Sequence, residues 1–281
     1  MTHPPQEADD FDLPSVRAQA GLATLERLAE TGSTMALARL WAAERSVLLP
    51  AAVVADRQTA GHGRRGAVWW QSPGSLAMSL VLDAAALGPS AGPTAPVTPL
   101  LSLACGVALA ETIRSLEPEV EALVRWPNDV VAGGRKLAGI LVETAAGGRI
   151  VIGIGVNTAG SSRDAPPRLE RRVATIPDLA GRPLPRGRLL GALVPRLLRL
   201  LGETTRDAGV LVERYRALCS LAGTTVTVHR EDGRRLSGPC LGIDRDGALV
   251  IDSVAGPVHL VSGSLTDPAD VWRGADGGTA S

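Results

Sequence analysis

Four short strand-like runs lie between residues 122 and 157, and no helical pattern separates them. Pro127 ends the first run, and pairs of consecutive glycines stand at residues 133–134 and 147–148. Proline ends a strand because its φ is fixed and it lacks an N–H, and glycine pairs mark tight turns. Consecutive strands without a crossover helix pair as a meander. The chain is therefore predicted to be an α+β protein with a mixed sheet flanked by helices, and not a doubly wound one.

Elsewhere the spacing of apolar residues predicts the remaining elements. Residues 51–55 are an unbroken apolar run, typical of a buried strand. Apolar residues at helical spacing predict a helix over residues 100–116. One or two helices are expected between residues 189 and 221, the first beginning near Pro195. Residues 160–187 are rich in Arg and Pro and are expected to wrap the surface.

The pattern changes after Gly223, where short strand-like runs alternate with turn pairs such as Asp232-Gly233 and Asp246-Gly247. These pairs are strong hairpin signals. They predict a small C-terminal SH3-like β-barrel. The expected organisation is a leader without regular structure, a catalytic-sized domain, this barrel, and a disordered tail, at residues 1–21, 22–222, 223–273 and 274–281.

Composition restricts the class of protein. The 281 residues carry no net charge and contain no basic block, so general binding to nucleic acid through phosphates is not expected. Three cysteines lie far apart in the chain without a CxxC pair, which indicates buried thiols in a reducing compartment. The first 20 residues lack the apolar core of a signal peptide, and the longest apolar stretch is too short to span a bilayer. A cytoplasmic protein without a membrane partner is expected.

Lys136 is the only lysine in the chain, so 28 of the 29 basic residues are arginine (29 − 1). A position that keeps lysine indicates a need for a compact ammonium, which donates in three directions. Lys136 is expected at the start of a strand, and the turn before it holds Asn128 and Asp129. A hairpin of this kind can hold the ammonium beside these two side chains. The sequence therefore predicts a site for an anionic group here.

Two other segments carry candidate site residues. Gly61-x-Gly63-x-x-Gly66 formally matches the dinucleotide fingerprint, but the Trp- and Pro-rich residues that follow cannot open the crossover helix that this motif requires. The segment is better interpreted as a loop that wraps an anionic ligand with Arg64 and Arg65. Ser33 fits the N-cap of a helix, and capping is favoured over a ligand contact on this stretch alone.

Taken in order, Ser33-Thr34, the run from Gln58 to Gly66, Trp126-Pro127-Asn128-Asp129, the run from Lys136 to Leu141 and Gly153-x-Gly155-Val156-Asn157 resemble the biotin protein ligases. The resemblance covers nearly the whole chain from about residue 22. It implies a biotin–[biotin carboxyl-carrier protein] ligase that forms biotinyl-5′-AMP from biotin and ATP and transfers biotin to a carrier lysine. Family members that repress transcription carry an N-terminal DNA-binding domain, and about twenty residues are too few for one, so no DNA partner is expected.

The resemblance also implies roles for individual residues. Arg64, Lys136 and Asp129 are the expected catalytic residues, and Asp129 is the nearest candidate to accept the proton of the incoming lysine. Mg²⁺ is expected to travel with the ATP phosphates, without certain protein ligands. The implied biotin contacts are Ser33, Thr34, Gln58, Gly61, His62, Gly63, Arg64, Lys136 and Gly139. The implied ATP or adenylate contacts are Trp69, Asn128, Lys136 and Asn157. The implied protein partner is the carrier domain of an acetyl-CoA, acyl-CoA or pyruvate carboxylase.

Two positions depart from the family pattern, because His62 and Ala67 stand where relatives usually have arginine. Losing a charge-assisted contact weakens retention of the intermediate by about ten- to a hundredfold. The sequence therefore predicts an adenylate that escapes more readily.

Two alternative functions remain open. A lipoate or octanoate ligase shares the fold and the carrier-lysine chemistry, although the polar Ser33-Thr34 pair and Gln58 suit a ureido group better than an aliphatic chain. A sensor that binds biotinyl-adenylate without transferring it is conceivable because of His62 and Ala67. The presence of Lys136 argues against the sensor.

Overall fold

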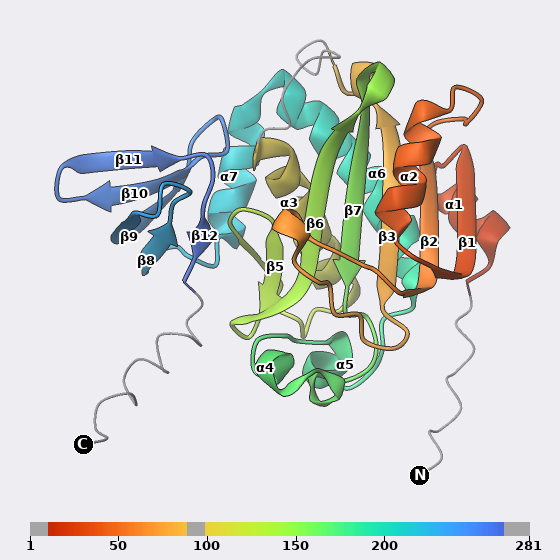
Figure 1. The fold of residues 1–281 in the computed structure, drawn as a ribbon, viewed down its shortest axis with the longest axis horizontal. Coiled ribbons are helices and arrows are strands. Elements are labelled where there is room, and N and C mark those ends of the chain that lie inside the picture. The colour runs from red at the N-terminus through yellow and green to blue at the C-terminus, as the bar shows by residue number, and fades with distance from the viewer. Residues whose placement is uncertain (1–10, 89–98, 267–281) are drawn as a thin grey trace.

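A seven-stranded mixed sheet forms the centre of the computed structural model, which describes residues 11–88 and 99–266 (Figure 1). The strand order is β1-β2-β3-β7-β6-β5-β4. β1 and β2 run parallel, and every other neighbouring pair is antiparallel. The α+β prediction and the meander over residues 122–157 are confirmed. The strands are β1 (Thr24–Thr31), β2 (Ala51–Gln58), β3 (Leu76–Asp83), β4 (Leu123–Arg125), β5 (Asp129–Ala132), β6 (Arg135–Ala145) and β7 (Arg149–Val156).

Helices cover both faces of this sheet. α2 (Thr34–Ala43) packs on one face, and α3 (Pro99–Leu116) lies with α6 (Arg186–Arg206) on the other. This arrangement explains the apolar run of β2, because Val53 joins the core under α2 and Val54 joins the larger core on the opposite face. α3 is long and apolar enough to cross a membrane, yet 61% of it is buried inside the protein, as expected of a core helix.

The predicted disordered leader is wrong for residues 13–20, which form helix α1 (Leu13–Ala20). Asp12 caps the helix by accepting a hydrogen bond from the Ser15 N–H, and Gly21 ends it in the left-handed conformation. Phe11, Val16 and Ala20 are buried, and α1 packs on α6. The prediction failed because only this small apolar stripe marks the helix among polar residues. Residues 1–10 lie outside the described part, as does the tail predicted at 274–281.

Two further connections differ from expectation. α6 begins at Arg186 and runs through Pro195, where a helix start was predicted. Proline removes one hydrogen bond from a helix, but α6 buries a long stripe of leucines against α3, and this packing maintains it. The segment 160–187 is more than a surface wrap, because Val173, Ala174 and Ile176 are buried. It contains η4 (Ser162–Asp164), α4 (Pro167–Glu170) and α5 (Ile176–Ala180).

The C-terminal strands form a separate antiparallel sheet in the order β11-β10-β9-β8-β12. The predicted short strands and hairpins are confirmed, but the closed SH3-like barrel is not, because β11 and β12 are opposite edges of an open sheet within the described residues. α7 (Ala208–Leu218) connects this sheet to the larger domain (Figure 1). The strands are β8 (Thr225–His229), β9 (Arg235–Ile243), β10 (Leu249–Ser253), β11 (Gly256–Leu260) and β12 (Ser264–Leu265).

Trp126 joins the two sheets. Its side chain is 1% exposed, and its Nε1 donates a hydrogen bond to the carbonyl of Gly247 in the β9–β10 turn (3.1 Å). Gly247 has a positive φ, and a Cβ there would lie 2.6 Å from the backbone nitrogen of Leu100. The β9–β10 turn therefore packs directly on the start of α3, which only glycine permits.

Candidate active site

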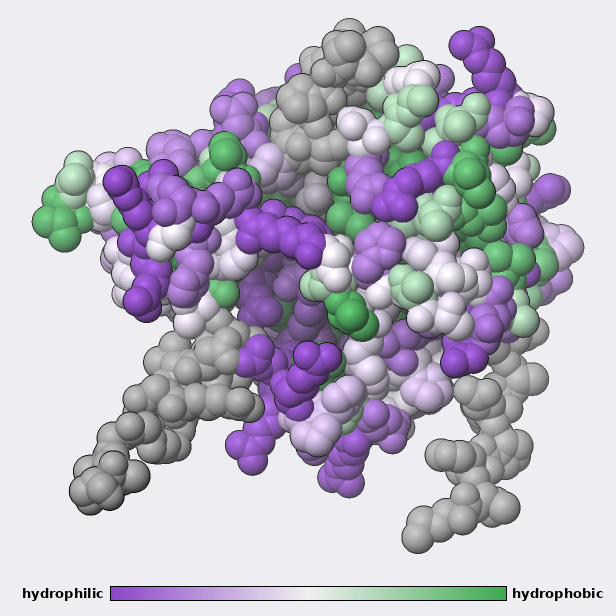
Figure 2. Space-filling model, in the orientation of Figure 1, coloured by the Kyte–Doolittle hydropathy of each residue, from purple (hydrophilic) through white to green (hydrophobic). Residues whose placement is uncertain are grey.

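A cavity of about 310 Å³ opens between the central sheet, the loop after β2 and the C-terminal sheet. Figure 2 shows hydrophilic residues surrounding a hollow on this face of the molecule. The cavity is lined from segments far apart in the chain, including β12 at Ser264–Leu265. Of the predicted site residues, these line it: Ser33, Thr34, Gln58, His62, Gly63, Arg64, Trp69, Asn128, Asp129, Lys136 and Gly139.

Bare backbone forms the floor of the cavity. Gly139 of β6 and Gly155 of β7 are cross-strand partners, and the indole ring of Trp69 lies over both. A Cβ at Gly155 would stand 2.6 Å from the ring, and one at Gly139 would stand 3.2 Å from it. Gly153 shares the face of Gly155 and similarly accommodates Met35. The predictions omitted Gly153 and Gly155, although their two-residue spacing places both on one face of a strand.

Lys136 and Arg64 contact two neighbouring residues where β5 begins. The Lys136 Nζ lies 2.6 Å from Oδ1 of Asp129, and Arg125 approaches the other Asp129 oxygen at 3.6 Å. The Arg64 Nη1 donates to Oδ1 of Asn128 at 3.4 Å. Asn128 is held in turn, because its Nδ2 donates to the carbonyl of Ile140 at 2.7 Å. The structure thus brings together side chains that the sequence separates by more than sixty residues.

The cavity carries an excess of positive charge. Four cations line it, namely Arg64, Arg65, Arg125 and Lys136, against the carboxylate of Asp129 in the lining and that of Glu231, which pairs with Arg65. Burial, together with the nearby charge of Arg65, lowers the pKa of Arg64 below its ordinary value. A partly desolvated guanidinium gains stabilisation from an anion placed beside it. This end of the cavity therefore suits a carboxylate or a phosphate.

The opposite end is polar but uncharged. Ser33 occupies the N-cap position of α2, but its side chain makes no capping hydrogen bond, so the predicted cap is wrong. Gln58 supplies the capping acceptor in place of Ser33, because its Oε1 accepts hydrogen bonds from the Thr34 N–H (2.9 Å) and Thr34 Oγ1 (3.1 Å). Ser79 donates to Thr34 Oγ1 from below at 2.8 Å. The end of β2 lies beside the helix start, which leaves the Ser33 hydroxyl at the cavity.

The loop after β2 folds back on itself without a crossover helix, as predicted. Gly63 N–H donates to the Ala67 carbonyl (2.7 Å), and Trp69 N–H donates to the Gly61 carbonyl (3.0 Å). Gly61 contributes this carbonyl but does not line the cavity. Arg65, which was predicted to contact an anionic ligand, donates to Glu231 in the β8–β9 turn and to Ser264 of β12 at 2.9 Å each. The loop is thus attached to the second sheet.

Asn157 lies outside the cavity, contrary to its predicted nucleotide contact. Its side chain is buried and donates to the carbonyl of Ala174 (3.0 Å). Its own backbone carbonyl accepts from the Ile176 N–H (2.9 Å). Asn157 therefore connects the end of β7 to residues 172–176. The same segment contacts Lys136, whose N–H donates to the Arg172 carbonyl.

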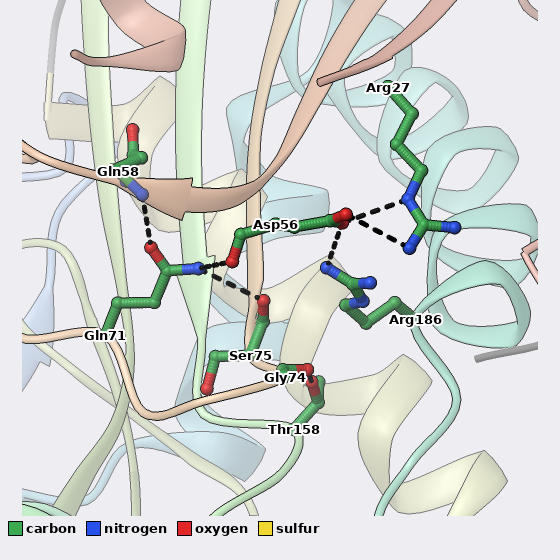
Figure 3. A network of polar contacts seen from close by, with 8 residues as sticks. All are labelled: Arg27, Asp56, Gln58, Gln71, Gly74, Ser75, Thr158 and Arg186. Atoms are coloured by element: carbon green, nitrogen blue, oxygen red, sulfur yellow. Dashed lines mark hydrogen bonds and ion pairs between the residues drawn. The ribbon is translucent and has the colours of Figure 1, made fainter. Parts of the chain in front are cut away.

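Asp56 holds the end of β2 through two arginines (Figure 3). Arg27 Nε and Arg186 Nη1 each lie 2.9 Å from Asp56 Oδ1. Desolvation opposes ionisation of Asp56, but the two arginines outweigh it and hold its pKa below the ordinary value of 3.8. Arg186 is buried, so the carboxylate of Asp56 offsets part of the cost of burying its guanidinium.

Replacing Asp56 with Asn is expected to lower the free energy of unfolding by about 1 to 3 kcal/mol at neutral pH, because it removes the carboxylate charge beside a buried guanidinium. Because folding lowers the pKa of Asp56, its ionised form stabilises the folded protein above the ordinary Asp range. This stabilisation is lost as the pH falls through the pKa of Asp56 in the folded state. Urea unfolding should therefore show a difference in the free energy of unfolding between wild type and Asp56→Asn, and this difference should become smaller below about pH 4. A gap that stays constant down to about pH 2 would contradict this account.

Comparisons with known proteins identify the family. The model of the biotin/lipoate A/B protein ligase family matches residues 15–157. The chain belongs to this family. It is 30% identical over 254 residues to the biotin–[acetyl-CoA-carboxylase] ligase of Mycobacterium tuberculosis, covering 88% of this chain and 90% of that ligase.

Similarity extends to a further relative and to a solved structure. The bifunctional ligase/repressor BirA of Escherichia coli is 34% identical over 211 residues, which cover 72% of this chain and 61% of BirA. Among solved structures, the biotin protein ligase of Aquifex aeolicus in complex with biotin and ATP superposes with a TM-score of 0.74 at 24% identity. The match covers 87% of this chain and 98% of that one, so the two proteins share a fold.

Proposed function

We propose that the protein is an ATP-dependent ligase that converts biotin to biotinyl-5′-AMP and transfers the biotinyl group to a lysine of a carboxylase carrier domain. The observation that carries this proposal is that Lys136 and Arg64 line one cavity and contact the neighbouring residues Asp129 and Asn128. The biotin ligases among its relatives support the choice of substrate. A lysine of an acetyl-CoA carboxylase carrier domain is the acceptor that their names imply.

In the first step a carboxylate oxygen of biotin attacks the α-phosphorus of ATP. The bond from that phosphorus to the bridging oxygen breaks, and pyrophosphate leaves. No general base is needed because the carboxylate is already ionised at neutral pH. Lys136 and Arg64 are placed to hold the two anionic reactants together and to stabilise charge that develops on the phosphate oxygens. Asp129 fixes the ammonium from 2.6 Å away, so we assign it a positioning role.

In the second step the amine of the carrier lysine attacks the acyl carbon of the adenylate. The carbon–oxygen bond to the phosphate breaks, AMP leaves, and the new amide nitrogen loses a proton. Both oxygens of Asp129 already face cations, Lys136 and Arg125. This arrangement favours positioning of Lys136 over proton transfer. An Asp129→Ala enzyme that forms and transfers the adenylate at the normal rate would remove both roles.

Magnesium is proposed to arrive with ATP. The described residues contain no group of three or more His, Cys, Asp or Glu side chains that could hold a metal ion. The carboxylate nearest the site, Asp129, is engaged by Lys136. These residues do not form a protein cage for Mg²⁺, and the ion commonly keeps water and phosphate oxygens as ligands.

The remaining contacts are assigned from the two ends of the cavity. Ser33, Thr34 and the Nε2 of Gln58 would face the polar ureido ring, and the rest of biotin would extend from there towards Lys136 and Arg64. Trp69 would cover adenine. Its Nε1 is buried and has no hydrogen-bond partner within residues 11–88 and 99–266. A buried donor without an acceptor is unfavourable, so a ligand that moves the ring or offers an acceptor is preferred.

One assay tests the proposal. The protein is incubated with ATP, Mg²⁺, an apo carrier domain and either biotin or lipoate, and the carrier is weighed by mass spectrometry. We expect the mass of one biotinyl group on the carrier and no lipoyl product. A lipoyl product alone would make the protein a lipoate ligase. Adenylate formation without modification of any carrier would instead identify a sensor.

Ala67→Arg tests the altered loop. Ala67 is exposed at the edge of the cavity, so an arginine has room there. We expect the variant to release biotinyl-adenylate about ten- to a hundredfold more slowly than wild type, because it restores one charge-assisted contact. Stopped-flow dissociation of preformed adenylate measures this rate. Unchanged release from the variant would show that position 67 does not control retention.

A further inference from the structure

β2 continues beyond the strand that pairs with it. The β2–β3 ladder ends at Ala55 opposite Ala77, whereas β2 runs on to Gln58 and remains paired with β1 on its other edge. The carbonyl of Asp56 and the N–H of Gln58 therefore extend past the end of this ladder. Unpaired backbone groups in a sheet need another partner.

The side chain of Gln71 supplies that partner. Its Nε2 donates to the Asp56 carbonyl at 3.0 Å, and its Oε1 accepts from the Gln58 N–H at 3.1 Å (Figure 3). The same Nε2 lies 3.4 Å from the carbonyl of Ser75, just before β3. One carboxamide thus takes the place of a peptide group in an extended β3 and connects three points of the backbone.

The position of Gln71 in the chain gives this contact a consequence for the site. On the β3 side, the loop with Arg64 and Trp69 leaves the sheet after Gln58 and has returned at Gln71. On the β1 side, the next two N–H groups still donate to the carbonyls of residues 31 and 32, at 3.0 and 2.8 Å. The bond from the Gln58 N–H to Gln71 therefore closes the neck of the loop. The same bond fixes the backbone of Gln58, whose side chain holds Thr34 at the polar end of the cavity.

The neck is attached to a rigid anchor. Both carboxylate oxygens of Asp56 are engaged, because Arg27 donates to Oδ1 and to Oδ2, and Arg186 lies 2.9 Å from Oδ1. The carbonyl that receives Gln71 belongs to this same residue. Movement of the neck away from Asp56 would therefore break the Gln71 bonds.

We infer that Gln71 is a positioning residue: its carboxamide closes the neck of the loop at residues 59–70 and so controls how long the intermediate is retained. This inference rests on the proposed function only for the identity of the ligand. Without the carboxamide the loop opens more often. Release of biotinyl-adenylate then accelerates and the KM for biotin rises, each by about tenfold, while kcat changes little.

Gln71→Glu and Gln71→Leu distinguish the hydrogen bonds from simple packing. In Gln71→Glu the ionised carboxylate still accepts from the Gln58 N–H but repels the carbonyls of Asp56 and Ser75. Those carbonyls raise the pKa of the new carboxyl, and its protonated form regains a donor. Adenylate release from Gln71→Glu should therefore be fast at about pH 8 and approach wild type towards about pH 5. Release from Gln71→Leu should be fast at both.

The matched control is Gln19→Glu, which makes the same chemical change on the exposed surface of α1. It should release adenylate like wild type at every pH. Equal and pH-independent acceleration in Gln71→Glu and Gln71→Leu would overturn the inference, because packing alone would then explain both variants. Wild-type release from Gln71→Leu would overturn it as well.

A second measurement needs no substrate. Hydrogen–deuterium exchange of peptides covering residues 59–70 should be about tenfold faster in Gln71→Leu than in wild type and Gln19→Glu. Peptides from the C-terminal sheet strands β10 and β11 should exchange alike in all three proteins. If wild type forms no adenylate, the proposed function fails while the exchange still tests the closed neck. If exchange in the loop is unchanged, the neck inference fails whatever the enzyme does.

Discussion

Lys136→Arg is expected to lower the rate of adenylate formation about 100- to 1000-fold, although the charge is kept. Lys136 Nζ lies 2.6 Å from Asp129 and 5.8 Å from the centre of a Trp69 ring, in a space bounded by the bare backbone of Gly139. A planar guanidinium is larger and cannot donate in three directions from this point. Removing one donor from a preorganised anion site commonly has this magnitude. Pyrophosphate release in the absence of carrier measures the step.

Arg135→Lys is the matched control for this prediction. It makes the opposite exchange at the neighbouring residue, whose side chain does not line the cavity, and should leave the rate unchanged. The KM for biotin should change less than kcat, because the lost interaction is strongest in the transition state. A Lys136→Arg enzyme with wild-type kcat would show that a positive charge alone suffices.

The sequence predicted those elements whose ends are set by residues close together in the chain. Pro127 and the glycine pairs define where strands of the meander end, so the order of β4 to β7 and the place of Lys136 at the start of β6 followed from local chemistry. The Asp232-Gly233 and Asp246-Gly247 pairs located the C-terminal hairpins for the same reason. Whether that second sheet closes depends on contacts between its edges, and no local pattern encodes them.

Contacts between distant segments were the part that the sequence did not reveal. Gly155 is spaced correctly for the floor, but only the folded chain shows that Trp69 lies on it. Gln71 looks like an ordinary loop residue in the sequence, because its hydrogen bonds form only where β2 and β3 lie side by side. Cys219 and Cys240 are far apart in the chain, yet their thiols meet where α7 joins β9, and a hydrogen bond from Cys240 lowers the pKa of Cys219.

Trp126 has a structural role beside the candidate anion site. It precedes Asn128 and Asp129, which face that site, and it lines the cavity as well. Its indole is buried at the junction of the two sheets, with Nε1 donating to the Gly247 carbonyl. A Cβ at Gly263, just before β12, would stand 3.8 Å from its ring. The side chain therefore holds the second sheet against the first.

Trp126→Ala is accordingly expected to lower the free energy of unfolding by about 3 to 5 kcal/mol, the usual effect of removing a buried aromatic side chain. Trp126→Phe should cost about 1 to 3 kcal/mol, because it keeps most of the packing but leaves the Gly247 carbonyl without its donor. Guanidinium unfolding followed by circular dichroism measures both, with the more exposed Trp41→Phe as control. Equal stability of Trp126→Phe and wild type would assign the whole effect to packing.

Since Ser264 and Leu265 line the cavity, Trp126→Ala should also loosen one wall of the site, and its KM for ATP should rise even under conditions where the protein remains folded.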